Sequence, residues 1–149
     1  MQARTLILGV FSLILASCAQ QVPAGTSGLF AKLQGSNVVP AVTTDAWGYA
    51  NATLNGTDLN ITGAFYRLSG KATSIELRQA KVGSNGGTVV CTLDIPEASR
   101  EAKTGSFGKL CTAKDHGIQE DLVKTGNYYI TVNTAANPAG EIRGQLGYE

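Results

Sequence analysis

Short runs of alternating apolar and polar residues, separated by glycine-rich turns, limit what this 149-residue chain can fold into. The clearest two runs, 128–134 and 141–146, flank the tetrapeptide Asn137-Pro138-Ala139-Gly140. Proline suits the second position of a type I turn and glycine suits the fourth, so this tetrapeptide predicts a tight turn between antiparallel strands. The alternation assigns Ile130, Val132, Ile142 and Leu146 to a core, and Thr131, Asn133, Glu141, Arg143 and Gln145 to water.

The same alternation recurs from Leu29 onward and predicts an all-β domain of short strands, which is typical of an antiparallel sandwich. Lys109 interrupts the apolar face shared by Phe107 and Cys111, which indicates a bulge or an edge strand. One helix is expected, with an N-cap at Asp115 and an end before Gly126. The predicted inward rows are Leu29, Ala31 and Leu33; Ala50, Ala52 and Leu54; Leu59, Ile61 and Phe65; Ile75 and Leu77; and Val89, Cys91, Leu93 and Ile95.

The first residues have the composition of an export signal. Arg4 precedes an apolar run at 6–15 that is too short to span a membrane comfortably. The run ends in Leu15-Ala16-Ser17-Cys18, which resembles a bacterial lipobox, the motif in which a cysteine is acylated and becomes the mature N-terminus. The alternative is an ordinary cleaved signal in which Cys18 is lost or irrelevant.

These features divide the chain into three predicted segments. We expect a lipoprotein signal peptide at 1–17, a lipid-anchored tether at 18–28, and a single β-sandwich domain at 29–149. The protein would then be exported and held in the bacterial cell envelope, at the outer membrane or the cell surface.

Charge excludes one class of partner. The full chain carries 12 basic and 11 acidic side chains, and loss of Arg4 with the signal leaves the mature protein neutral. A neutral chain with scattered charges has no electrostatic reason to bind nucleic acid or anionic lipid. Attachment to a membrane would therefore depend on the acyl chains at Cys18.

Two cysteines remain after Cys18, namely Cys91 and Cys111. An even number in an exported, oxidising setting favours one disulfide, although two buried free thiols are the alternative. Closing a loop of about 20 residues stabilises a fold by about 3 kcal/mol in the chain-entropy description. A metal site built on these two cysteines alone would lack the further ligands that zinc or copper needs.

Four stretches resemble the CHRD module, which is named for chordin and is common in exported bacterial proteins. They are F-A-K-L-Q-G-S-N-V-V-P-A-V at 30–42, the segment 48–70 ending in L-S-G, G-T-V-V-C-T-L at 87–93, and the segment 129–146 with N-P-A-G-E-I-R-G-Q-L. The resemblance implies an immunoglobulin-like or superoxide dismutase-like antiparallel Greek-key sandwich, here with one short helix, similar in outline to the copper/zinc superoxide dismutase barrel. It implies no settled activity, because fold does not determine function.

Members of that family usually carry H-x-H in the fourth strand and a further histidine before the N-P-x-G turn. In this chain those positions correspond to Glu76, Arg78 and Asn133, so all three imidazoles are missing. The single histidine, His116, is a weak candidate for a metal ligand, since a redox copper site needs several imidazoles. We expect no catalytic residues and no cofactor; the alternative is a superoxide dismutase-like oxidative-stress protein with a degenerate copper site.

Glu76 and Arg78 share one strand face, and Glu141 and Arg143 share another. Cross-strand ion pairs would explain these four residues structurally. The functional interpretation adds Asn133 and treats all five as a patch that contacts another envelope protein. The favoured expectation is therefore a lipid-anchored, non-catalytic structural or protein-binding module.

Aromatic residues offer further contact anchors. Trp47, Tyr49 and either Tyr128 or Tyr129 lie near glycine-rich segments, where they would contact a partner or pack at the ends of the sandwich. A third possibility, binding of an envelope glycan, depends only on Trp47 and the tyrosines.

Overall fold

The computed structural model of the protein describes residues 26–84 and 86–148. The predicted signal peptide and the Cys18 acylation site lie outside the described residues. The strands are β1 (Thr26–Gln34), β2 (Trp47–Asn55), β3 (Asp58–Tyr66), β4 (Ala72–Gln79), β5 (Thr88–Thr92), β6 (Gly105–Cys111), β7 (Tyr128–Thr134) and β8 (Ile142–Gln145). The helices are η1 (Gly35–Asn37), α1 (Glu97–Arg100), α2 (Ala113–His116) and α3 (Glu120–Lys124).

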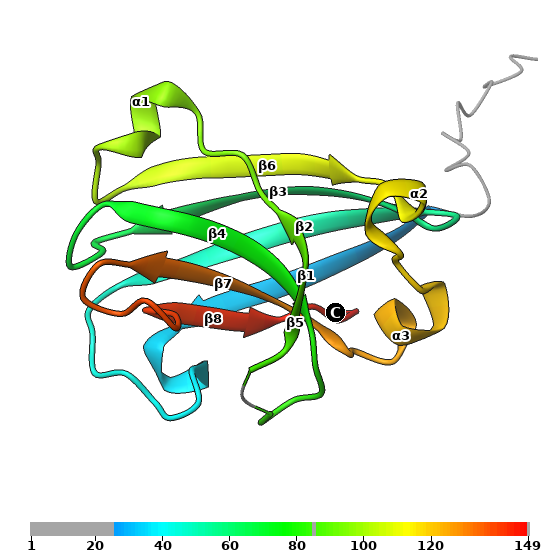
Figure 1. Ribbon diagram of the computed structural model, residues 1–149, viewed down its shortest axis with the longest axis horizontal. Helices are drawn as coiled ribbons and strands as arrows, with labels where there is room; N and C mark the ends of the chain where they lie inside the picture. Colours follow the sequence, from blue (N-terminus) through cyan, green and yellow to red (C-terminus); the bar gives the residue numbers. More distant parts are fainter. Residues whose placement is uncertain (1–25, 85, 149) are drawn as a thin grey trace, which may run out of the picture.

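The eight strands form one antiparallel sheet in the order β5-β4-β7-β8-β1-β2-β3-β6. The sheet folds over itself, so that β4, β7 and β8 lie in front of β1, β2, β3 and β6 (Figure 1). The connections from β3 to β4, from β5 to β6 and from β6 to β7 join strands that are not neighbours in this order. The prediction of an all-β, antiparallel Greek-key sandwich is confirmed.

Both sides of the sandwich are closed by contacts between its layers. On one side β8 meets β1, where Arg143 pairs with Gln34, and an isolated bridge joins Phe30 to Gly147. On the other side the two edge strands, β5 and β6, are joined by the disulfide between Cys91 and Cys111 and by the nearby bridge between Asp94 and Gly108. The predicted disulfide is confirmed, and β6 is the edge strand that the position of Lys109 indicated.

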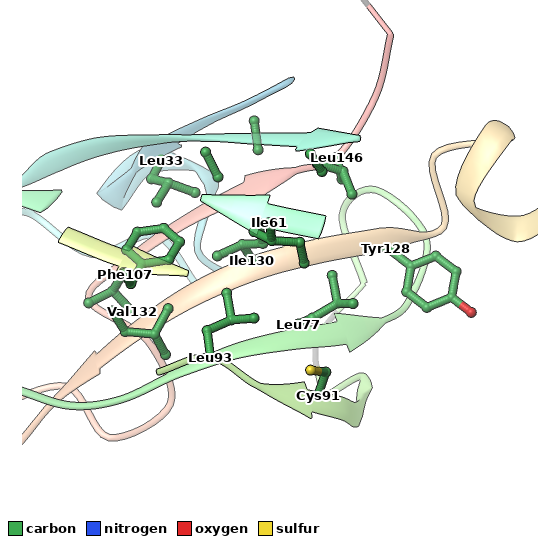
Figure 2. Packing of buried hydrophobic residues seen from close by; sticks show 14 of the residues in the cluster. Leu33, Ile61, Leu77, Cys91, Leu93, Phe107, Tyr128, Ile130, Val132 and Leu146 are labelled. Atoms are coloured by element: carbon green, nitrogen blue, oxygen red, sulfur yellow. The ribbon is translucent and has the colours of Figure 1, made fainter. Parts of the chain in front are cut away.

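The core fills the space between the layers. Leu77 of β4 and Ile130 and Val132 of β7 belong to one buried cluster with Ile61 of the opposite layer (Figure 2). Almost every predicted inward residue is buried, because alternation in a strand with one covered face follows the period of two. No helix among the described residues has the length and apolarity needed to cross a membrane.

Strand β5 departs from the predicted inward row at its first residue. Val89 is 44% exposed, whereas Cys91 and Leu93 are buried and Ile95 is partly buried against the core. The register shifts between Leu77, which pairs with Cys91, and Arg78, which pairs with Val89. A bulge at this point reverses the alternation, so Val90 instead packs against the core.

The prediction of a single helix beginning at Asp115 is wrong. Thr112 is the N-cap of α2, and its hydroxyl accepts a hydrogen bond from the backbone N–H of Asp115. Gly117 then adopts φ +63° and ends α2 after one turn, and a separate helix, α3, follows. Gly126, also at positive φ, follows α3 as predicted. Helix α1 lies in a segment for which the sequence predicted no helix.

The turn between β7 and β8 is confirmed. The backbone N–H of Gly140 donates to the carbonyl oxygen of Asn137 at 3.0 Å, which closes the four-residue turn. Gly140 has φ +125°, and a Cβ atom there would lie 2.5 Å from the hydroxyl oxygen of Thr131. Glycine is therefore required by backbone conformation and by space.

Candidate functional site

The strand register brings the predicted patch residues onto one outer face of the sandwich. Glu76 of β4 pairs with Thr131 of β7, and Thr131 pairs in turn with Arg143 of β8. One step along the same strands, Ser74 pairs with Asn133. These side chains alternate with the core row, so they point away from the core and toward one another.

The expectation that this face meets water is wrong. Thr131 is 2% exposed, Asn133 4%, Arg143 5% and Glu141 0%, while Gln145 is partly buried. The periodicity identifies the face but not what covers it. Two connecting segments lie over it, one between β1 and β2 and one between β4 and β5, and both contact these strands through hydrogen bonds.

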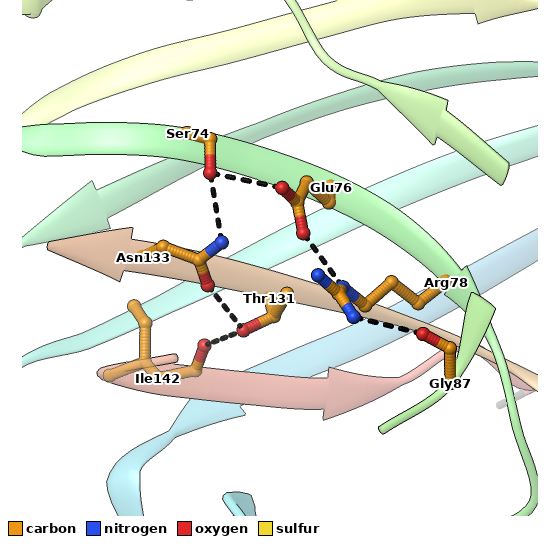
Figure 3. Close-up of polar contacts among 7 residues, drawn as sticks. All are labelled: Ser74, Glu76, Arg78, Gly87, Thr131, Asn133 and Ile142. Carbon is orange, nitrogen blue, oxygen red and sulfur yellow. Dashed lines mark hydrogen bonds and ion pairs between the residues drawn. The ribbon is translucent and has the colours of Figure 1, made fainter. Parts of the chain in front are cut away.

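Glu76 and Arg78 form an ion pair within one strand, not across strands. Arg78 Nε donates to Glu76 Oε2 at 2.7 Å, and Arg78 Nη1 donates to the carbonyl oxygen of Gly87 at 2.9 Å (Figure 3). Ser74 Oγ donates to the other carboxylate oxygen, Oε1, at 3.1 Å. The two charged side chains are 14% and 26% exposed, so they are the accessible part of this cluster.

Asn133 completes the cluster from the neighbouring strand. Its amide Nδ2 donates to Ser74 Oγ at 2.8 Å, and its Oδ1 accepts from the hydroxyl of Thr131 at 3.2 Å (Figure 3). The same hydroxyl lies 3.5 Å from the carbonyl oxygen of Ile142. Within the described residues, no buried side-chain nitrogen or oxygen lacks a hydrogen-bond partner. Every buried polar side-chain atom of the cluster therefore has a hydrogen-bond partner within the domain.

Glu141 belongs to a different environment. Its Oε1 accepts from the backbone N–H of Ser69 at 2.8 Å and from Thr44 Oγ1 at 2.9 Å. Its Oε2 accepts from Ser69 Oγ at 2.6 Å and from Thr134 Oγ1 at 2.8 Å. Burial opposes ionisation, but these hydrogen bonds outweigh it and hold the pKa of this carboxyl below its usual value. Glu141 therefore links three segments by hydrogen bonds. Its side chain is fully buried, so it cannot contact a partner protein.

Arg143 is a buried cation with neutral neighbours. Its guanidinium lies over the ring of Tyr129, 3.8 Å from the centroid. Nη1 donates to the carbonyl oxygen of Ser84 at 2.8 Å, and Nη2 donates to Gln145 Oε1 at 3.2 Å. Burial lowers the pKa of Arg143, and the nearby Tyr129 opposes this effect. The ion pairs found among the described residues include neither Glu141 nor Arg143, so the expected cross-strand ion pairs with Glu76 and Arg78 do not occur.

The residues at the three expected histidine positions do not fit a copper ion. Arg78 is a cation and cannot be a ligand, and both oxygens of Glu76 already accept hydrogen bonds. His116 lies on α2, outside β4 and β7, which carry the other three residues. In the part of the chain that the structure describes, no group of three or more His, Cys, Asp or Glu side chains could hold a metal ion.

The predicted aromatic anchors divide into exposed and buried residues. Trp47 is 46% exposed and stacks on Tyr66 with ring centroids 4.2 Å apart, while Tyr49 lies 6.5 Å from the same ring. Tyr128 and Tyr129 are buried, and the Tyr128 hydroxyl accepts from the backbone N–H of Gln119. Tyr66 was missed by the sequence analysis, although its pairing opposite Trp47 follows from the hairpin turn at 55–58.

The fold and this outer face define a class of protein: a closed Greek-key sandwich whose polar face is internally hydrogen-bonded and lacks a histidine cluster. A comparison with known protein families matches the CHRD domain over residues 29–146. The chain belongs to the CHRD domain family. Comparisons with curated proteins and with solved structures gave no match.

Proposed function

We propose that this protein is a lipid-anchored, non-catalytic β-sandwich module of the bacterial cell envelope that acts by structure or by binding another envelope protein. The observation that carries the proposal is the closed cluster of Ser74, Glu76, Arg78 and Asn133. At the positions where the family resemblance places histidines, these side chains are engaged with one another. Such a cluster stabilises a face of the domain and offers no set of free ligands or activated nucleophile.

The accessible members of the predicted patch are Glu76 and Arg78, and we place the partner contact there. Asn133 supports that surface through its hydrogen bond to Ser74, whereas Glu141 and Arg143 are buried and hydrogen-bonded elsewhere, so they are not part of the contact. Partly buried charge pairs at an interface contribute orientation and specificity to a complex. The stacked pair of exposed Trp47 and partly buried Tyr66 supplies a second surface of the residue types common in interfaces.

Charge reversal tests the partner contact. The double variant Glu76→Arg/Arg78→Glu retains an opposite-charge pair but loses the hydrogen bond from Arg78 to the Gly87 carbonyl oxygen, so its unfolding midpoint should fall while the native circular dichroism spectrum is retained. It should reduce recovery of cross-linked envelope proteins relative to the wild-type chain. The matched control is Lys71→Glu/Glu101→Lys, which reverses an exposed pair on another surface. Equal recovery from the wild type and the 76/78 variant would remove the patch from the proposal.

The anchor is tested by labelling growing cells with radioactive palmitate. The wild-type chain should take up label, and Cys18→Ala should take up none and should leave the membrane fraction. Label that persists in Cys18→Ala, or no label on the wild type, would show that Cys18 is not acylated.

The competing function, a superoxide dismutase-like protein with a degenerate copper site, lacks ligands in this chain. His116 is the single histidine of the whole sequence, and it lies on a helix away from the expected histidine positions. A redox copper site requires several imidazoles.

A further inference from the structure

The outer face carries a hollow of about 420 Å³ beside Arg143. It lies where η1 and the connection between β4 and β5 approach each other over β1 and β8. The polar side chains that line it include those of Lys32, Asn37, Arg143 and Gln145, and Val39 and Val82 contribute apolar walls. Neither the partner contact nor the Glu76 cluster uses this hollow.

Arg143 brings an uncompensated charge to the wall of the hollow. Its residue is 5% exposed, yet its contacts are a carbonyl oxygen, an amide oxygen and an aromatic ring, with no carboxylate. Burying a charge is costly unless an opposite charge or strong hydrogen bonds compensate it. The two side-chain hydrogen bonds engage two of the five N–H groups of a guanidinium, which leaves donors for a further acceptor.

Lys32 adds a second positive charge. Gln34 pairs with Arg143 across β1 and β8, so the antiparallel register places Lys32 next to Gln145, at the rim of the hollow. The Lys32 side chain is exposed, and the ion pairs found among the described residues do not include it. No acidic residue is among those that line the hollow. Two cations, two amides and no carboxylate are complementary to an anion.

We propose that this hollow binds a small oxyanion, a carboxylate or phosphate group, between Arg143 and Lys32. The guanidinium supplies directed N–H donors and the ammonium supplies a mobile charge, which together match the oxygens of such a group. The group is either a free ion or the terminal group of a larger ligand, and both use the same contacts. The proposal is independent of the partner contact at Glu76 and Arg78.

The test uses the purified full chain in detergent with inorganic phosphate and acetate as probes and chloride at equal ionic strength as the reference. We expect phosphate or acetate to raise the melting temperature. In NMR titrations, either probe should shift the amide signals of residues 32–37, 82–84 and 143–145 until the site is saturated. The tighter of the two probes identifies the group. Binding to the folded state alone produces such stabilisation by mass action. Equal effects of all three salts, or shifts spread evenly over the surface, would overturn the proposal.

Three variants separate this site from general charge effects. Lys32→Gln, at an exposed position, should weaken binding about threefold, and Arg143→Gln about tenfold or more. Lys114→Gln removes an exposed lysine on α2, outside the hollow, and should leave the affinity unchanged. If Arg143→Gln does not fold, Lys32→Gln decides: an affinity equal to that of Lys114→Gln would contradict the proposal.

Discussion

Glu141 and Ser69 are joined by two hydrogen bonds, from the backbone N–H and the hydroxyl of Ser69 to the two carboxylate oxygens, although 72 residues separate them. The same carboxylate accepts from Thr44 and Thr134. It therefore joins two connections of the sandwich, β1 to β2 and β3 to β4, and the end of β7 to the start of β8. A buried carboxylate with four donors is a structural element whose removal leaves those donors without a partner.

Replacing this carboxylate should destabilise the fold strongly. Glu141→Gln removes the charge and presents an NH₂ group to donors, so we expect a loss of about 2 to 4 kcal/mol in the free energy of unfolding. The measurement is a urea titration followed by circular dichroism. Glu101→Gln, in an exposed ion pair, is the control and should change stability by less than about 0.5 kcal/mol. Similar midpoints for the two variants would contradict this role of Glu141.

Stability should fall in acid because of the same residue. The folded-state pKa of Glu141 lies below its ordinary value of 4.5, so the unfolded chain binds the proton more readily. The stabilisation is complete above the unfolded pKa and is lost as pH falls from there through the folded pKa. Melting temperatures measured from pH 7 down to pH 2 should therefore drop below about pH 4.5. The melting temperature of Glu141→Gln should drop less. The same drop in acid for both proteins would show that Glu141 does not cause it.

Opening the disulfide should weaken the closure of the sandwich. The bond joins β5 and β6, the two ends of the sheet order, across a sequence separation of 20 residues. Cys91→Ser/Cys111→Ser should lower the free energy of unfolding by about 3 kcal/mol through greater freedom of the unfolded chain. Dithiothreitol should destabilise the wild type by a similar amount and leave the double variant unchanged. No effect of the reductant on the oxidised wild type would contradict this closure.

Gly140 should not tolerate a side chain. Gly140→Ala places a Cβ atom 2.5 Å from Thr131 Oγ1 in a backbone conformation with φ +125°, and we expect a loss of about 2 kcal/mol or more. Gly147→Ala is a matched control because no atom lies within 4 Å of its Cβ position. Denaturant unfolding of the two variants gives the comparison. A Gly140→Ala protein as stable as Gly147→Ala would show that the turn can relax.

Periodicity predicted the core but not the outer face. Ile130, Val132 and Ile142 are buried as expected, because a strand with one covered face alternates with period two. Thr131 and Arg143 follow the same alternation onto the opposite face, yet they are buried by segments distant in sequence. Alternation tells which residues share a face and carries no information about which loops cover that face.

The other differences between the sequence predictions and the structure arise from neighbouring residues, at the N-cap of α2 and at the bulge in β5. Asp115 has the chemistry of an N-cap, but Thr112 takes that position and hydrogen-bonds to Asp115 instead. Val89 continues an apolar row in the sequence, but a bulge in β5 rotates it outward. The disulfide was predictable from two cysteines in a chain whose first residues resemble an export signal. The hollow beside Arg143 was not predictable, because it depends on the placement of two connections.

We predict that the outer face, at the positions where CHRD members usually carry histidines, binds no copper and has no dismutase activity. The most direct measurement is the copper content and dismutase activity of the purified chain after incubation with equimolar Cu²⁺ and desalting. Glu76, Arg78 and Asn133 are hydrogen-bonded to one another or to Ser74. We therefore predict less than one copper per chain and no dismutase activity above that of buffer alone. One retained copper per chain together with dismutase activity would contradict the account.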